Sequence, residues 1–435
     1  MGAKRIRRVF SNRNVLVISL TSSLAMFFNM LYWPFWSKYL VEEPPNGLGL
    51  SITVVGLLSA IQRSQRLLFQ LPGGVLADRL GRKKVTLMAA ATRMVPPLIY
   101  LWARRWEFLA IGSFFSAMSS LGSPAFTAMI AESLPRDQMG SGYAIFGMVR
   151  RVPMLFTGII GGMLMDALGI WKGTRICLIG SFISAAIVFV IRYLFLTETL
   201  VRGGRHKRSL KEDFKEVLPL FKGSLMGMQI TSAISQFAAG LIMSLIIIYV
   251  TGVIGLSYTQ WGLISTAMSI ISFLTAMPGG MIADRFNRVK LIIFARAISP
   301  ITTLGYIFLR DFYQILAVRV VAGIGAGLSG AGQMGWMGGP AWNSLLADII
   351  PPEKRGRVSG LMGTISGLAA LPAPYIGAYM WDMESIGPEK TMLTSVVLGL
   401  VSTAIFWRTV KDPRSEGRGI KEPAKGDREE NQSKG

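Results

Sequence analysis

The chain has little of what soluble enzymes use for chemistry. Cys177 is the only cysteine among 435 residues, so no intrachain disulfide can form. His206 is the only histidine, which excludes a metal site or a proton relay built from histidines. No aspartate or glutamate lies in the middle of a long apolar run, and no nucleophile–base pair or metal-ligand cluster is apparent. We therefore expect no enzymatic activity, no metal and no cofactor.

What the sequence has in abundance is apolar length. It is 51% hydrophobic with a mean hydropathy of +0.45, which is too apolar for a soluble protein of this size. The formal charge of +22 would suit nucleic-acid binding only if the basic residues gathered on one soluble face. Here they separate apolar runs instead. We expect a multi-pass membrane protein that contacts membrane lipids and binds no nucleic acid.

Twelve apolar runs approach the roughly 20 residues that a helix needs to cross a bilayer. In the first half they lie near 14–38, 51–77, 84–103, 107–131, 140–165 and 173–196. In the second half they lie near 223–251, 257–283, 289–309, 311–347, 357–381 and 391–409. The glycine-rich stretch 323–339 leaves open whether the tenth helix is kinked or broken.

Lysine and arginine predict the orientation of these runs. Segments that we assign to the cytosol hold roughly five times as many of these cations as segments that we assign to the outside. No cleavable signal peptide is evident at the N-terminus. We expect a plasma-membrane protein whose N- and C-termini both lie in the cytosol.

One motif occurs twice. Residues 73–85 read GGVLADRLGRKKV, and residues 279–291 read GGMIADRFNRVKL. Further residues recur 216 positions apart, among them Glu132 with Asp348 and Asp166 with Asp382. Repetition on this scale indicates two copies of one membrane unit.

The motif resembles the loop between the second and third helices of the major facilitator superfamily, and the resemblance covers nearly the whole chain. It implies an all-α polytopic membrane protein with 12 transmembrane helices in two pseudo-symmetric six-helix bundles. We expect bundles at 1–196 and 223–410, a cytosolic linker with an amphipathic helix at 197–222, and a disordered cytosolic tail at 411–435. The resemblance also implies a secondary transporter that moves a small-molecule substrate by alternating access. We expect a monomer, and coupling to a proton or another ion stays open.

The resemblance gives the motif loops a gating role. In the family, the loop aspartate rests on the N-terminal end of a helix in the other bundle and holds the cytosolic gate closed, as helix-dipole physics permits. This assigns gating to Asp78, Arg79, Arg82, Asp284, Arg285, Arg288, Glu132 and Asp348. Asp78 is expected near Ser359 and Asp284 near Ser141, while Arg82 would pair with Glu132 and Arg288 with Asp348. The alternative is that the loops are only orientation signals.

Arginines at mid-membrane depth are the candidate substrate site. Arg63 and Arg66 share one face of the second helix near its middle, and Arg150 lies near the middle of the fifth. Arg93 is expected nearer an interface. An unpaired central arginine costs at least about 3 kcal/mol, so it requires water, a carbonyl partner or an anionic ligand.

Three interpretations of these arginines remain open, and one of them is binding of a lipid headgroup. Their guanidinium groups suit the carboxylate or phosphate of an anion in a water-filled cavity. Alternatively, they bind helix carbonyls and lock the bundle. The repeat positions of Arg63 and Arg66 are Ser269 and Ser272, which favours the anion, because an architectural need would recur in both halves.

The resemblance also places the first, fourth, seventh and tenth helices along the central path. Asn29, Tyr32 and Gln236 are therefore further candidates for substrate contact, although Tyr32 would also fit an interfacial aromatic belt. We expect a small organic solute as substrate, and an anionic one if the deep arginines bind it. A multidrug-type efflux transporter of amphiphilic compounds is the alternative, and a transport-fold sensor is the alternative outside that class.

Overall fold

The computed structural model describes residues 12–134, 146–200, 216–329, 340–351 and 354–414. The first half comprises α2 (Arg13–Tyr32), η1 (Trp33–Phe35), α3 (Trp36–Val41), α4 (Ile52–Leu80), α5 (Arg82–Thr92), α6 (Val95–Trp102), α7 (Trp106–Met118), η2 (Ser119–Leu121), α8 (Gly122–Ser133), η4 (Val152–Phe156) and α10 (Thr157–Phe195). The second half comprises η5 (Leu218–Leu220), α12 (Gly223–Ile242), α13 (Ile246–Gly252), α14 (Tyr258–Arg285), α15 (Arg288–Phe308), α16 (Phe312–Ser329), α17 (Pro340–Ile349), α18 (Arg355–Ala369), α19 (Ala373–Asp382) and α20 (Gly387–Thr409).

These elements form twelve membrane-crossing segments. Eight stretches of the described residues are long and apolar enough to cross a membrane, and one of them, Phe146–Phe195, crosses twice. It turns at Gly169, whose φ of 78° is a conformation that favours glycine. The second and eighth segments, α4 and α14, have 29 and 28 residues but carry several polar side chains. The tenth segment begins with α16 and ends with α17, and residues 330–339 between them lie outside the described part of the chain.

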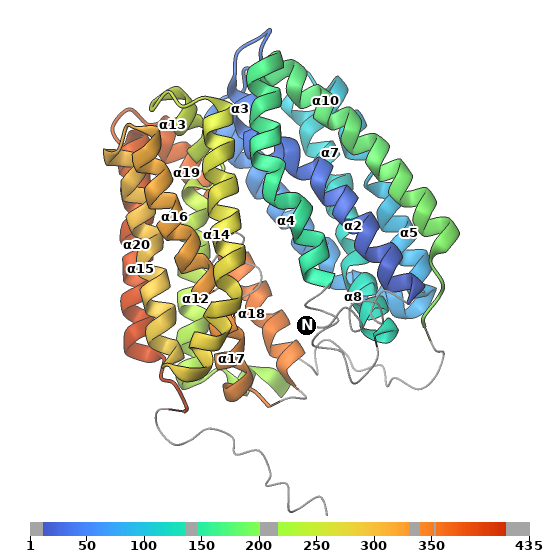
Figure 1. Cartoon of the computed structure of the whole chain (residues 1–435), viewed down its shortest axis with the longest axis vertical. Helices are drawn as coiled ribbons and strands as arrows, with labels where there is room; N and C mark the ends of the chain where they lie inside the picture. The colour runs from blue at the N-terminus through green and yellow to red at the C-terminus, as the bar shows by residue number, and fades with distance from the viewer. Residues whose placement is uncertain (1–11, 135–145, 201–215, 330–339, 352–353, 415–435) are drawn as a thin grey trace, which may run out of the picture.

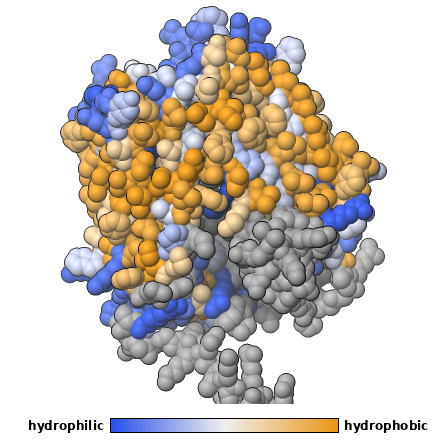
Figure 2. All heavy atoms as spheres, in the orientation of Figure 1, coloured by the Kyte–Doolittle hydropathy of each residue, from blue (hydrophilic) through white to orange (hydrophobic). Residues whose placement is uncertain are grey.

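The two halves lie side by side as separate helical bundles (Figure 1). They approach each other near α3 and α13 and diverge toward the end that carries α8, α17 and the start of α18. The largest apolar cluster joins the halves at the approaching end, where Phe35 and Tyr39 of the first half belong to one core with Tyr249 and Trp261 of the second. The outer faces of the helices are apolar over a broad band, as expected for a surface that contacts lipid (Figure 2).

The second bundle extends beyond its expected end at 410. Asp412 is 3% exposed and accepts hydrogen bonds from the backbone and the guanidinium of Arg288. Arg414 Nε donates to Asp348 at 2.9 Å. The tail therefore does not begin at 411, because a carboxylate just past α20 is needed to neutralise a buried arginine.

The linker between the halves is described only in part. Residues 201–215, where we expected most of the amphipathic helix, lie outside the described residues. After them, Glu216 pairs with Lys354 at 3.2 Å and with Arg357 at 2.6 Å. The end of the linker is thereby attached to the start of α18.

Candidate substrate-binding site

Arg63 reaches from the first half to the second. It lies about 17 Å along α4 from Ile52, close to mid-membrane depth. A Cβ built on Gly240 of α12 would lie 3.2 Å from Arg63 Nη1. The absence of a side chain at Gly240 thus leaves room for a guanidinium between the two bundles.

Arg93 lies at a break in the third membrane segment. It was not among the substrate-binding residues predicted from the sequence. α5 ends at Thr92 and α6 begins at Val95, ahead of Pro96 and Pro97. Our expectation that Arg93 lies nearer an interface was wrong, because it stands about 17 Å along the segment from Arg82. Two consecutive prolines soon after an arginine are the sequence signal that marks such a break.

Four arginines form one electrostatically linked group, which we call the arginine cluster: Arg63, Arg66, Arg93 and Arg150. Arg93 interacts with Arg66, Arg150 and the Tyr32 hydroxyl, and Arg63 interacts with Arg66. The side chains of Arg66 and Arg93 reach the surface of the protein, while those of Arg63 and Arg150 are half-buried. Among the described residues, no carboxylate forms an ion pair with Arg63, Arg93 or Arg150.

A polar recess lies between the halves. Figure 2 shows a hollow between the two apolar faces, with hydrophilic residues visible inside it. Like charges held together in a site of low dielectric repel one another, and an anion between them removes that repulsion. The arginine cluster therefore has the chemistry of an anion site.

The other three candidates lie in less exposed positions. Tyr32 is 4% exposed, packs edge-on against Trp36, and accepts a hydrogen bond from Asn29 Nδ2 at 3.1 Å. Gln236 on α12 is half-buried, and its Nε2 donates to Ser232 Oγ at 3.4 Å. The structure places Tyr32 beside the cluster through Arg93, whereas Gln236 lies on the opposing half.

Deep arginines of the second half have a different surrounding. Arg319 is 3% exposed and lies over the rings of Trp261 and Tyr306, with its guanidinium carbon 5.3 and 5.8 Å from their centroids. Arg296 lies over two further rings at 4.7 and 5.5 Å. Cation–π contacts of this kind stabilise a buried charge without a ligand. The structural interpretation thus suits Arg296 and Arg319 better than the arginine cluster.

The motif arginines connect helices within each half. Arg82 pairs with Asp78 at 2.6 Å and with Glu132 at 3.6 Å. Arg288 is fully buried and pairs with Asp348 at 2.9 Å. Both expected ion pairs are present, and each joins the start of one helix to the end of the next.

The expected contact between Asp78 and Ser359 is absent from this conformation. Both residues are exposed, and Asp78 pairs with Arg82 in its own loop instead. The physical reason is that the halves diverge on this side, which we call the motif face (Figure 1). The side chains of Asp284 and Arg285, and Ser141, lie outside the described parts of the chain, and Arg79 is exposed.

On the opposite side, two aspartates connect the halves in a reciprocal way that the sequence did not predict. Asp166 of α10 accepts hydrogen bonds from Tyr258 N at 3.0 Å and Thr259 N at 2.7 Å, at the start of α14. Asp382 of α19 accepts from Thr53 N at 2.9 Å and Thr53 Oγ1 at 2.5 Å, at the start of α4. We call these contacts the inter-half caps, and their side the capped face. A carboxylate at a helix N-terminus satisfies free amides and interacts favourably with the helix dipole.

Known proteins provide an independent comparison. A family model described as Major Facilitator Superfamily matches residues 18–236 and again residues 228–430. The Multidrug resistance protein MdtG of Salmonella arizonae is 26% identical over 350 residues, which cover 78% of this chain and 81% of that protein. The protein of the same name from Serratia proteamaculans is 23% identical over 349 residues, with 77% and 78% covered.

Solved structures share the fold at low identity. A D-xylose–proton symporter superimposes with a TM-score of 0.70 at 16% identity, covering 92% of this chain and 98% of its own. A point mutant of the nucleoside transporter NupG superimposes with a TM-score of 0.71 at 12% identity, covering 92% and 100%. At these identities the likeness concerns the arrangement of the helices alone.

Proposed function

The chain belongs to the major facilitator superfamily and is a multi-pass membrane transporter, and we propose that the solute it carries is a small organic anion. The observation that carries this proposal is the arginine cluster, which holds four cations at mid-depth in the first half. Retaining cations at this depth is costly in free energy, and an anionic substrate offsets that cost. Guanidinium groups bind carboxylate and phosphate through paired hydrogen bonds, which gives the site a preference for those anions.

The direction we propose is export by alternating access. Similarity to proteins named for multidrug resistance supports efflux, while the fold neighbours include a proton symporter, so a coupling ion is compatible with the fold. With the termini in the cytosol, the motif face is cytosolic and this conformation is open to the inside. The inter-half caps then hold the outer side closed, and Asp78 and Asp284 would close the inner side in the opposite state.

A second candidate is export of amphiphilic compounds irrespective of charge. The names of the curated relatives favour it, as does the aromatic pair of Tyr32 and Trp36, whose tyrosine interacts with Arg93. The two candidates differ in what the arginines do. In the second one they would support the bundle, and substrates would bind by apolar contact.

The remaining features of the proposal concern the whole protein. We propose a monomer of the plasma membrane, with two functional six-helix bundles and with no enzymatic step or nucleic-acid partner. Substrate contact is assigned to the arginine cluster with Asn29, Tyr32 and Gln236. Gating is assigned to the motif loops with Glu132 and Asp348.

Ligand-induced thermal stabilisation of the purified protein tests the proposal. Organic anions, organic cations and neutral amphiphiles are compared in the wild type and in Arg63→Gln, Arg66→Gln and Arg93→Gln. Losing one charge-assisted hydrogen bond weakens anion binding about 10- to 100-fold. Arg319→Gln is the control, because it removes a buried membrane arginine of the other half that lies on aromatic rings.

Flux into liposomes then separates the candidates. The anion proposal expects transport of the stabilising anions by the wild type and by Arg319→Gln, and reduced transport by the cluster variants. Equal stabilisation and transport of cations and neutral amphiphiles in all variants would overturn it in favour of the second candidate. Binding without any flux would instead favour a sensor.

A further inference from the structure

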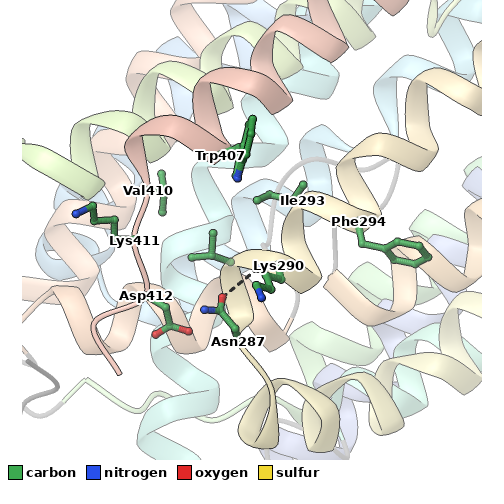
Figure 3. A pocket seen from close by; sticks show the side chains of 9 residues that line it. Asn287, Lys290, Ile293, Phe294, Trp407, Val410, Lys411 and Asp412 are labelled. Atoms are coloured by element: carbon green, nitrogen blue, oxygen red, sulfur yellow. Dashed lines mark hydrogen bonds between the residues drawn. The ribbon is translucent and has the colours of Figure 1, made fainter. Parts of the chain in front are cut away.

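A hollow of about 510 Å³ opens on the motif face between the start of α15 and the end of α20 (Figure 3). We propose that it binds the headgroup of an anionic phospholipid. The proposal concerns residues on the outside of the second bundle and is independent of the arginine cluster. The hollow is lined by two lysines and two aromatic side chains, and a carboxylate lies beside them.

The lining residues are arranged by depth as a phospholipid is. Lys290 is the third residue of α15 and Lys411 follows the end of α20, and both are exposed at the rim. Phe294 lies four residues further into the membrane than Lys290, about 6 Å along α15, and Trp407 lies in the last turn of α20, four residues before Lys411. They are 56% and 73% exposed, so their rings face the bilayer. A basic rim above exposed aromatic rings matches a phosphate above acyl chains.

The carboxylate in the hollow does not cancel these cations. Asp412 Oδ1 accepts from Arg288 Nη2 at 2.5 Å, and its Oδ2 accepts from the Arg288 backbone amide at 3.0 Å. The first amides of α15 are also occupied, because Lys290 N donates to Asn287 Oδ1 at 3.1 Å. The helix N-terminus therefore offers no anion site of its own, and the side chains of Lys290 and Lys411 supply the attraction.

The first half has a corresponding site at the start of α5, but it lacks a lysine equivalent to Lys411. Glu198 plays the part of Asp412 there, since it accepts from the amides of Arg82 and Lys83 at 2.9 and 3.1 Å. Counting from these two carboxylates, Thr197 stands where the second half has Lys411. Lys84 corresponds to Lys290 through the motif repeat. The repeat thus provides an internal comparison in which one half has a pair of rim lysines and the other has one.

A lipid fits this arrangement better than a free anion of the same chemistry. Two rim lysines alone would bind inorganic phosphate equally well. Inorganic phosphate, however, would leave the exposed rings of Phe294 and Trp407 uncovered. With a lipid, the acyl chains cover the rings while the lysines bind the phosphate. The bound headgroup would also lie beside the Arg288 network, which connects α15 to α17 through Asp348.

Native mass spectrometry of the delipidated full chain measures the binding. Phosphatidylglycerol is titrated against phosphatidylcholine in the wild type and in the double variant Lys290→Gln/Lys411→Gln. Because each lysine contributes about fivefold to the attraction of an anionic headgroup, the double variant should bind phosphatidylglycerol about 30-fold more weakly. The control Lys83→Gln/Lys84→Gln removes the same charge from the start of α5, the helix of the first half that corresponds to α15, and should bind as the wild type does.

Each other outcome overturns the proposal. Equal binding of phosphatidylcholine would show that the headgroup charge is not recognised, and an equal loss in both double variants would show that only overall charge matters. Competition by inorganic phosphate at the same concentration as the lipid would assign the site to a free anion. Thermal unfolding of each variant without lipid shows whether it is folded, and Lys290→Arg/Lys411→Arg should retain binding where the glutamine variant loses it.

Discussion

The inter-half caps should determine how stable the capped face is. We consider the double variant Asp166→Asn/Asp382→Asn, which keeps the shape of both side chains and removes their charge. Each aspartate accepts two hydrogen bonds from the start of a helix in the other half. The substitution therefore weakens contacts between the halves without leaving a cavity inside either of them.

The expected magnitude follows from the exposure of the two carboxylates. A charged N-terminal cap is worth about 1 kcal/mol at an exposed site, and both aspartates are exposed. Losing both charges costs the closed arrangement about 2 kcal/mol, since the caps are far apart and independent. The ratio of closed to open molecules on this face then falls about 30-fold.

Distance measurements between spin labels test this value. Glu43 and Glu384 lie on exposed loops beside the caps, one in each half, and Cys177→Ser removes the only other thiol. Pulsed electron resonance on Glu43→Cys/Glu384→Cys should show a longer distance whose population grows in the double variant. Asp311→Asn is the control, because Asp311 caps its own helix through Tyr313 N at 2.8 Å and contacts no residue of the other half in the described structure. Unchanged populations in the double variant, or an equal change in the control, would refute the reasoning.

Three further outcomes follow from contacts described above. Arg288→Gln should lower the free energy of unfolding by about 3 kcal/mol or more, because it leaves Asp412 buried without its cation, and Arg288→Gln/Asp412→Asn should recover part of the loss in chemical denaturation. Burial raises the pKa of Glu198, but hydrogen bonds from backbone amides outweigh it and leave the pKa below its ordinary value. Its stabilisation is therefore complete above about pH 4.3 and is lost as the pH falls through the lowered pKa, so melting temperatures between pH 3 and pH 6 should depend less on pH in Glu198→Gln. Gly262→Ala should open the capped face in the spin-label assay, since its Cβ would overlap a carbonyl oxygen of α10, whereas Gly252→Ala has open space around it and should not.

Much of the fold was predictable because the bilayer imposes a length on every apolar run. The family resemblance of the repeated motif also predicted the ion pairs of Arg82 with Glu132 and of Arg288 with Asp348, and the structure contains both. The boundary at 410 was wrong. Asp412 follows the last apolar residue, and only the burial of Arg288 shows that this acid belongs to the bundle.

The arginine cluster was predictable in part. Helical spacing identifies Arg63 and Arg66, because both lie on one face of an unbroken helix. Arg93 was assigned to the wrong depth, although the prolines after it indicate a break at mid-membrane. The charges that act on Arg93, those of Arg66 and Arg150, come from other helices, and spacing along the chain does not show which helices lie near one another.

The missing contact of Asp78 with Ser359 has a different cause. A transporter has at least two states of similar free energy, and a sequence encodes both. The structure is open on the motif face, so it shows Asp78 in the state in which its expected partner is distant. The repeat pair Asp166 and Asp382 was visible in the sequence, but its role depends on which face is closed.

The reciprocity of the inter-half caps has a consequence for the origin and assembly of the chain. Asp166 belongs to the first half and binds the second, and Asp382 belongs to the second half and binds the first. A two-fold symmetric pair of identical subunits makes contacts of this kind automatically, because whatever one subunit gives it also receives. The caps thus have the reciprocity of a homodimer interface, here formed within one polypeptide. Covalent order is irrelevant to them, so the two halves expressed as separate chains, or joined in reverse order, should still recognise each other through the same two aspartates.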